Sequence, residues 1–66
     1  MNQEQINLLK KLGLPTEFDG LSDDELIEIE ERISDEMLYW GVNDAGDGLN
    51  EYGELCRQTI IDLPDD

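Results

Sequence analysis

The sequence has no histidine, a single cysteine, and only four lysine and arginine residues against eighteen aspartates and glutamates. Without histidine, catalytic triads, histidine-ligated metal centres and imidazole acid–base catalysis are excluded. The lone Cys56 cannot form an internal disulfide, and it lacks a histidine base that would make it a nucleophile. These absences predict that the chain is not an enzyme and that it carries no cofactor.

The scarcity of cations leaves a formal net charge of −14 on a chain of 66 residues. Such a charge repels nucleic acids and anionic membranes, because both are polyanions, and it attracts basic surfaces over long distances. A protein with a basic surface is therefore the expected partner, with no direct contact to nucleic acid or membrane.

No apolar run is long enough to cross a bilayer, and no signal-peptide pattern opens the sequence. A single reduced cysteine suits a reducing compartment. We therefore expect a soluble, cytoplasmic protein.

The pattern of caps and apolar residues predicts an all-α fold. Ser22 can cap a helix in which Glu25 completes a capping box. This helix should cover residues 23–40 and end at Gly41, where glycine can adopt the left-handed conformation. Helices are also expected over residues 2–12 and 51–62, with a frayed tail at 64–66. The chain should thus form one domain, a small three-helix bundle.

One stripe of the central helix follows the spacing of a core-facing surface. Its members are Leu26, Ile29, Ile33, Met37 and Trp40. We expect this stripe, with Trp40 as a packing residue, to face the other two helices.

The opposite stripe of the same helix is acidic and ends in an aromatic residue. Between Asp19 and Glu36 there are nine acidic residues and one base, Arg32. A face that serves only solubility usually mixes the two signs of charge, although a simple solvated surface remains the alternative. The predicted partner-binding residues are Asp24, Glu28, Glu31, Asp35 and Tyr39.

Residues 43–54 partly match the calcium-binding loop of EF-hands. Asp47, Gly48 and Glu54 occupy the fifth, sixth and twelfth places of that loop. The first place holds Asn43, and Ala45 at the third has no oxygen to offer. A turn followed by a helix cap at Asn50 is therefore favoured over a metal site, and weak calcium binding stays an open alternative.

Several segments resemble short acidic bacterial proteins encoded beside polymorphic or contact-dependent toxins. The resemblance lies in Leu21-Ser22-Asp23-Asp24-Glu25-Leu26, Ile29-Glu30, Asn50-Glu51-Tyr52-Gly53, Leu55-Cys56 and Ile60-Ile61-Asp62. It implies an immunity protein, an antitoxin that binds its cognate toxin directly as a heterodimer in the cytoplasm of the producing bacterium. The same resemblance implies that the toxin is a nuclease.

The central arrangement is also similar to the acidic, helical immunity proteins of nuclease colicins. This chain is shorter, and it has Tyr39-Trp40 where those proteins carry a pair of tyrosines. The same electrostatics would serve a second kind of molecule, a phage-encoded acidic DNA mimic that inhibits a host nuclease or nucleic-acid-binding protein. The two hypotheses share the acidic face and differ in the partner.

Overall fold

Three helices make up the regular structure of the chain, which the computed structural model describes over residues 1–64. They are α1 (Gln3–Lys11), α2 (Asp23–Trp40) and α3 (Glu51–Ile61). The predicted all-α, three-helix fold is confirmed, with each boundary within a residue of its predicted place. Of the predicted tail, Pro64 is exposed, and the last two residues lie outside the described part of the chain. Within residues 1–64, no helix combines the length and apolar character needed to cross a membrane.

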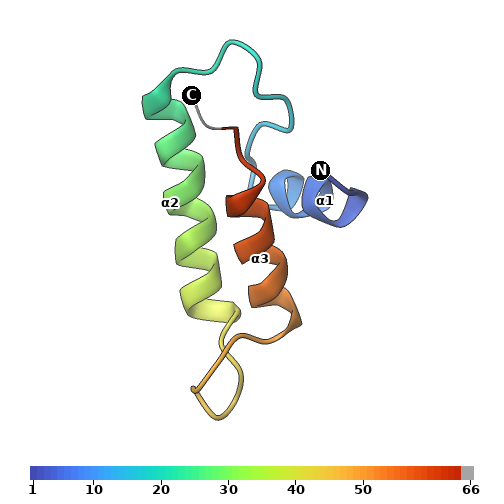
Figure 1. Cartoon of the computed structure of the whole chain (residues 1–66), viewed down its shortest axis with the longest axis vertical. Helices are drawn as coiled ribbons and strands as arrows, with labels where there is room; N and C mark the ends of the chain where they lie inside the picture. Colours follow the sequence, from blue (N-terminus) through green and yellow to red (C-terminus); the bar gives the residue numbers. More distant parts are fainter. Residues whose placement is uncertain (65–66) are drawn as a thin grey trace.

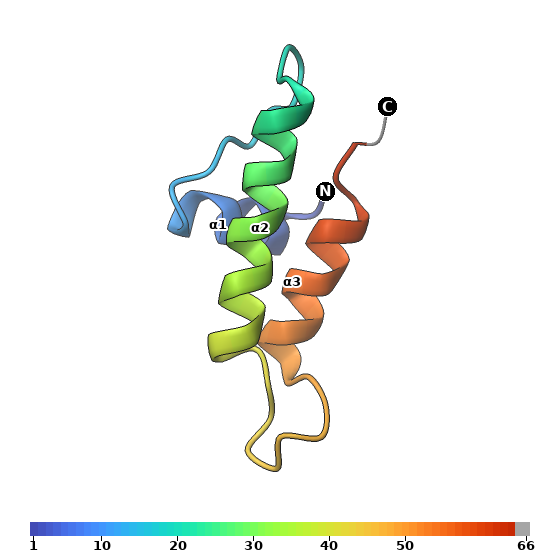
Figure 2. The same ribbon diagram turned by 90° about the vertical axis from the view of Figure 1, so that its left-hand side faces the viewer.

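α2 and α3 lie side by side and run in opposite directions, and the much shorter α1 crosses one side of this pair (Figure 1). The view turned by 90° shows α1 behind α2 and the loop between α2 and α3 projecting beyond both helices (Figure 2). α2 therefore has one side against its neighbours and a long side directed away from them.

Each helix begins at a polar cap. The Ser22 hydroxyl accepts a hydrogen bond from the Glu25 amide at 3.2 Å, and the Glu25 carboxylate accepts one from the Ser22 amide at 3.4 Å, which completes the predicted capping box. Asn2 and Gln5 form the same reciprocal pair at the start of α1. Asn50 caps α3, as predicted. These caps satisfy amides that have no partner within the helix.

The core consists of a few apolar side chains from all three helices, and buried polar groups complete it. The buried apolar residues are Leu8, Leu9, Ile29, Ile33 and Cys56. Gln5 is also buried, and its amide nitrogen donates to the Asp62 carboxylate at 2.8 Å. Thr59 is buried and donates to the Leu55 carbonyl at 2.7 Å. Within residues 1–64, each buried side-chain hydroxyl or amide thus has a partner, which avoids the cost of an unsatisfied polar group.

Gly41 ends α2 for a different reason from the one predicted. Its φ of −99° is not left-handed, so conformational freedom does not explain the glycine. A Cβ on Gly41 would lie 2.6 Å from the Gly53 Cα, and a Cβ on Gly53 would lie 2.0 Å from the Gly41 oxygen. The two backbones touch where α2 ends and α3 begins, and only glycine at both positions permits that approach. The left-handed prediction for Gly41 was wrong, and close packing replaces it.

Candidate functional site

The predicted acidic stripe lies on the side of α2 that faces away from the other helices. All five of its residues are exposed, and Tyr39 at its end is 80% exposed. The stripe was predicted from helical periodicity, and α2 is helical over its whole length, so the five side chains share one face as expected. We call this surface, from Asp24 to Tyr39, the outward face of α2.

Ion pairs are concentrated elsewhere. Within residues 1–64, the two ion pairs join Lys11 and Arg32 to the same carboxylate, that of Glu36. Arg32 is the only basic residue of α2, and it is directed to Glu36 rather than to the outward face. The negative charges of the outward face are therefore left without ion-pair partners in this part of the chain, and they add together in the field around α2.

Glu36 is buried, with 8% of its surface exposed, although its charge suggested a surface position. One carboxylate oxygen accepts a hydrogen bond from the Tyr52 hydroxyl at 2.8 Å. Arg32 Nη1 lies 3.4 Å from the other oxygen, and Lys11 Nζ lies 3.8 Å from the first. These partners compensate the loss of water around a buried carboxylate. The sequence did contain a signal, since Glu36 follows Ile33 by three residues on the buried stripe and follows Arg32 by four.

Tyr52 is held by the same cluster. Burial, followed by the hydrogen bond and the negative charge of Glu36, raises the pKa of the Tyr52 hydroxyl. Lys11 Nζ lies 4.6 Å from the centroid of the Tyr52 ring and donates to its hydroxyl at 3.2 Å. Burial and then the charge of Glu36 also raise the pKa of the Cys56 thiol. Cys56 is fully buried and packs as a core residue.

The prediction that Trp40 packs in the core was wrong, because its side chain is 67% exposed. Trp40 has the angular position of a core residue, but it stands in the last turn of α2. There it borders an open hollow with Lys11, Glu36 and Tyr52. Periodicity gives the direction of a side chain around the helix. It does not show where along the helix the neighbouring elements end.

The outward face also contains apolar residues that the sequence analysis did not select. Ile27 is 50% exposed and Leu38 is 67% exposed. They lie on one side of the helix with Glu31 and Ser34, at the spacing i, i+4, i+7, i+11. Ser34 is small, and around it is a hollow of about 330 Å³. Isolated surface apolar residues are ordinary, and these two share one side of α2.

The loop between α2 and α3 uses its polar side chains for its own structure. The Asn43 side chain donates to the Asp47 carboxylate at 3.0 Å, and its oxygen accepts from the Asp47 amide at 3.4 Å. Asn50 donates to the Trp40 carbonyl at 2.9 Å in addition to capping α3. No group of three or more Cys, Asp or Glu side chains in residues 1–64 is arranged to hold a metal ion. The loop has the geometry of the turn and cap that the sequence favoured.

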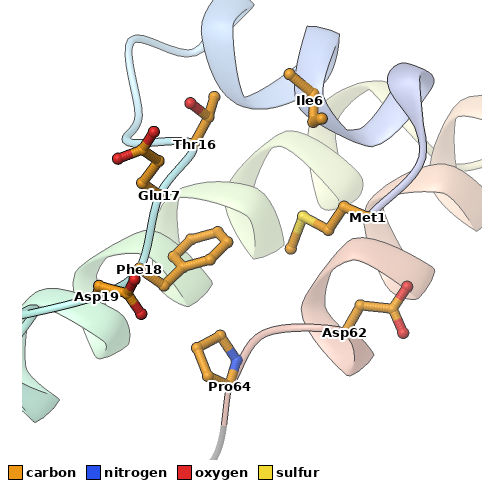
Figure 3. Close-up of a pocket in the computed structure, with 8 residues that line it drawn as sticks. All are labelled: Met1, Ile6, Thr16, Glu17, Phe18, Asp19, Asp62 and Pro64. Atoms are coloured by element: carbon orange, nitrogen blue, oxygen red, sulfur yellow. The ribbon is translucent and has the colours of Figure 1, made fainter.

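A third hollow, of about 470 Å³, lies between the start of the chain, the connector before α2 and the end of α3. In Figure 3, the ring of Phe18 points into it, opposite Met1 and Pro64. Its carboxylates come from Glu17, Asp19 and Asp62. Asp62 already accepts hydrogen bonds from two side chains, and Phe18 packs against the core. This hollow lies where three elements meet, and two of its lining side chains, Asp62 and Phe18, are already engaged by the fold.

Compared with known proteins, the chain matches no protein-family model, no curated protein and no solved structure. The outward face of α2 is therefore the feature of this chain from which a function can be inferred.

Proposed function

We propose that this chain is an immunity protein, which neutralises a bacterial toxin by docking the outward face of α2 on a basic surface of that toxin. The observation that carries the proposal is the unequal treatment of carboxylates on one helix. Glu36 receives both ion pairs found in residues 1–64, while Asp24, Glu28, Glu31 and Asp35 receive none. A row of uncompensated charges costs the monomer stability through self-repulsion, and a cationic partner would relieve that cost.

The same charges support a nuclease as the toxin. Nucleases and other enzymes that act on polyanions carry basic substrate-binding surfaces. An acidic helix would occlude such a surface, and the opposite charges would speed the encounter. The alternative is a phage-encoded DNA mimic acting on a host protein. The exposed Ile27 and Leu38 favour the immunity protein, because a phosphate backbone presents no apolar counterpart to imitate.

The test co-expresses this chain with the product of the neighbouring reading frame, which the proposal requires to be a toxin. Changing Glu28, Glu31 and Asp35 together to Lys should lower the association rate at low salt by about tenfold or more and abolish protection. Far-UV circular dichroism should show that the variant remains helical.

The matched control changes three exposed acids outside the helices, Glu17, Asp19 and Asp44, to Lys. Both triple variants shift the net charge equally, so any difference between them is due to where the reversed charges lie. If the control loses protection as completely as the α2 variant, total charge rather than the outward face is responsible. A chain that inhibits a host nucleic-acid-binding protein and leaves the neighbouring toxin active would support the DNA mimic instead.

A further inference from the structure

The outward face of α2 has the composition of a docking surface and no element of residues 1–64 covers it. Ile27 and Leu38 stand on it with half or more of their side chains exposed. They are eleven residues apart, or about 16 Å along the helix axis. Side chains at i, i+4, i+7 and i+11 are the usual contacts of a helix that lies against a partner. In α2 the two ends of that pattern are apolar and the two middle positions are Glu31 and Ser34.

Between the two apolar ends lies the hollow around Ser34. Three carboxylates border it, and Ile27 forms its apolar wall. The lining residues are Ile27, Glu30, Glu31, Ser34 and Asp35. Within residues 1–64 no ion pair reaches these carboxylates, and Arg32 is engaged by Glu36. The hollow therefore combines three negative charges with an apolar wall.

The three negative charges and the apolar wall determine what kind of group can bind in this hollow. A second copy of this chain would bring another net charge of −14 to the surface, and like charges repel. A bare metal ion is not favoured, because these carboxylates do not form a metal-holding group. A long side chain with an apolar stem and a positive head fits both the wall and the rim. Arginine suits several carboxylates best, since its planar group donates to more than one at once.

We propose that the outward face of α2 docks a basic, amphipathic segment of the partner protein, with an arginine of that segment over Ser34 and apolar contacts at Ile27 and Leu38. The inference rests on the proposed function and refines it. The row of Ile27, Glu31, Ser34 and Leu38 is centred about 70° around the helix from the stripe predicted by charge and periodicity, and it shares Glu31 with that stripe. The acidic residues attract the partner, and the apolar ends retain it.

The first experiment needs no toxin. The probe is a short acetylated and amidated peptide in which leucines alternate with pairs of arginines, titrated into ¹⁵N-labelled protein. A second peptide has glycine in place of each leucine and the same charge. We expect the leucine peptide to bind about fivefold tighter or more, because it buries apolar surface that the glycine peptide lacks. The largest amide shifts should fall in residues 27–38. Equal affinities, or equal shifts at Glu51 and Glu54 of α3, would overturn the inference.

Variants then locate the contact. Changing Ile27 and Leu38 together to Gln should remove the preference for the leucine peptide. The matched control changes Val42 and Ile61, which are also exposed, to Gln and should keep the preference. Ser34→Phe fills the hollow without altering the charge, and it should weaken binding of both peptides about fivefold or more. Unchanged affinity of the Ser34→Phe variant for both peptides would show that no arginine binds over Ser34.

Failure here is separable from failure of the proposed function. If charge reversal on α2 abolishes protection while the peptides show no preference, the immunity role stands and the docking geometry is wrong. If the peptides behave as expected but the charge reversal leaves protection intact, the surface binds basic segments and the proposed docking of the toxin on α2 is wrong. If the unaltered chain gives no protection at all, the immunity role is wrong.

Discussion

Asp35 and Glu36 are consecutive residues of α2 with the same charge, yet they have opposite surroundings. Glu36 is buried and meets Tyr52, Arg32 and Lys11 within 4 Å. Asp35 is exposed on the outward face and has no ion pair within the described chain. The inner carboxylate receives two of the four cations in the sequence, and the outer ones receive none. The cations that form ion pairs in the described chain thus do so at the buried acid, where an unpartnered charge would cost most.

The largest loss of stability is expected on the inner side of α2, where its backbone touches that of α3. In Gly53→Ala, the new methyl would lie 2.0 Å from the Gly41 oxygen, so α2 and α3 must separate. We expect a loss of about 4 kcal/mol or more, enough to unfold a chain of this size. Urea unfolding followed by circular dichroism measures it. Gly48→Ala is the control, because its Cβ would meet its nearest neighbour at 3.4 Å. Similar unfolding midpoints for the two variants would contradict the close contact.

Two isoleucines of α2 give the next comparison. Ile33 is fully buried and Ile27 is half exposed. Ile33→Ala should cost about 3 kcal/mol of unfolding free energy through lost burial and a cavity, whereas Ile27→Ala should cost less than about 1 kcal/mol. Chemical denaturation of both variants checks this. An Ile27→Ala cost as large as that of Ile33→Ala would mean that the outward face supports the fold rather than a partner.

The two consecutive acids provide a smaller but sharper test. Glu36→Ala leaves the Tyr52 hydroxyl without its acceptor and the two cations without their carboxylate, and we expect a loss of about 2 kcal/mol. Arg32 and Lys11 are themselves largely exposed, so water compensates part of their loss. Asp35→Ala should stay within about 0.5 kcal/mol, since it removes one like charge and gains helix propensity. Thermal and urea unfolding should agree. Equal effects would erase the distinction between the two positions.

The smallest expected effect is a decline in stability at alkaline pH. Tyr52 and Cys56 have pKa values raised in the folded state by burial and by Glu36, so the folded chain keeps protons that the unfolded chain loses. Their contribution is complete below about pH 9 and falls as pH rises further. Tyr52→Phe should reduce this slope in urea unfolding under reducing conditions. Tyr39→Phe, at an exposed position, should leave it unchanged. A slope that is insensitive to Tyr52 would show that the hydroxyl is not protected by Glu36.

Local chemistry made the helices predictable from the sequence. Ser22, Glu25 and Asn50 act within a few residues of their own positions, so the sequence alone identifies the beginnings of α2 and α3. The end of α2 was predicted at the right residue for the wrong reason. The contact of Gly41 with Gly53 joins two helices, and no pattern local to either residue reveals it.

The candidate site was predictable in part for the same reason. Helical periodicity was enough to place the five predicted residues on one exposed face. They are Asp24, Glu28, Glu31, Asp35 and Tyr39. Periodicity wrongly placed Trp40 in the core, because the angular position of a side chain around a helix does not show where the neighbouring helices end. It missed Glu36 because burial of a charge depends on Lys11 and Tyr52, which come from other helices. The apolar Ile27 and Leu38 became visible only as exposed surface.

The contact between Gly41 and Gly53 also governs what the loop between them can do. The Asn50 amide donates to the Gly41 carbonyl at 2.9 Å, and Val42 pairs with Leu49, so the segment is fastened at its base on both sides. Because these contacts hold the base of the loop, we expect a fluorophore or an affinity tag attached at residues 44–48 to leave α2 and α3 undisturbed. The tip of this loop is therefore a site for attaching a label. It lies beyond the end of α2, away from the acidic face that a partner would bind.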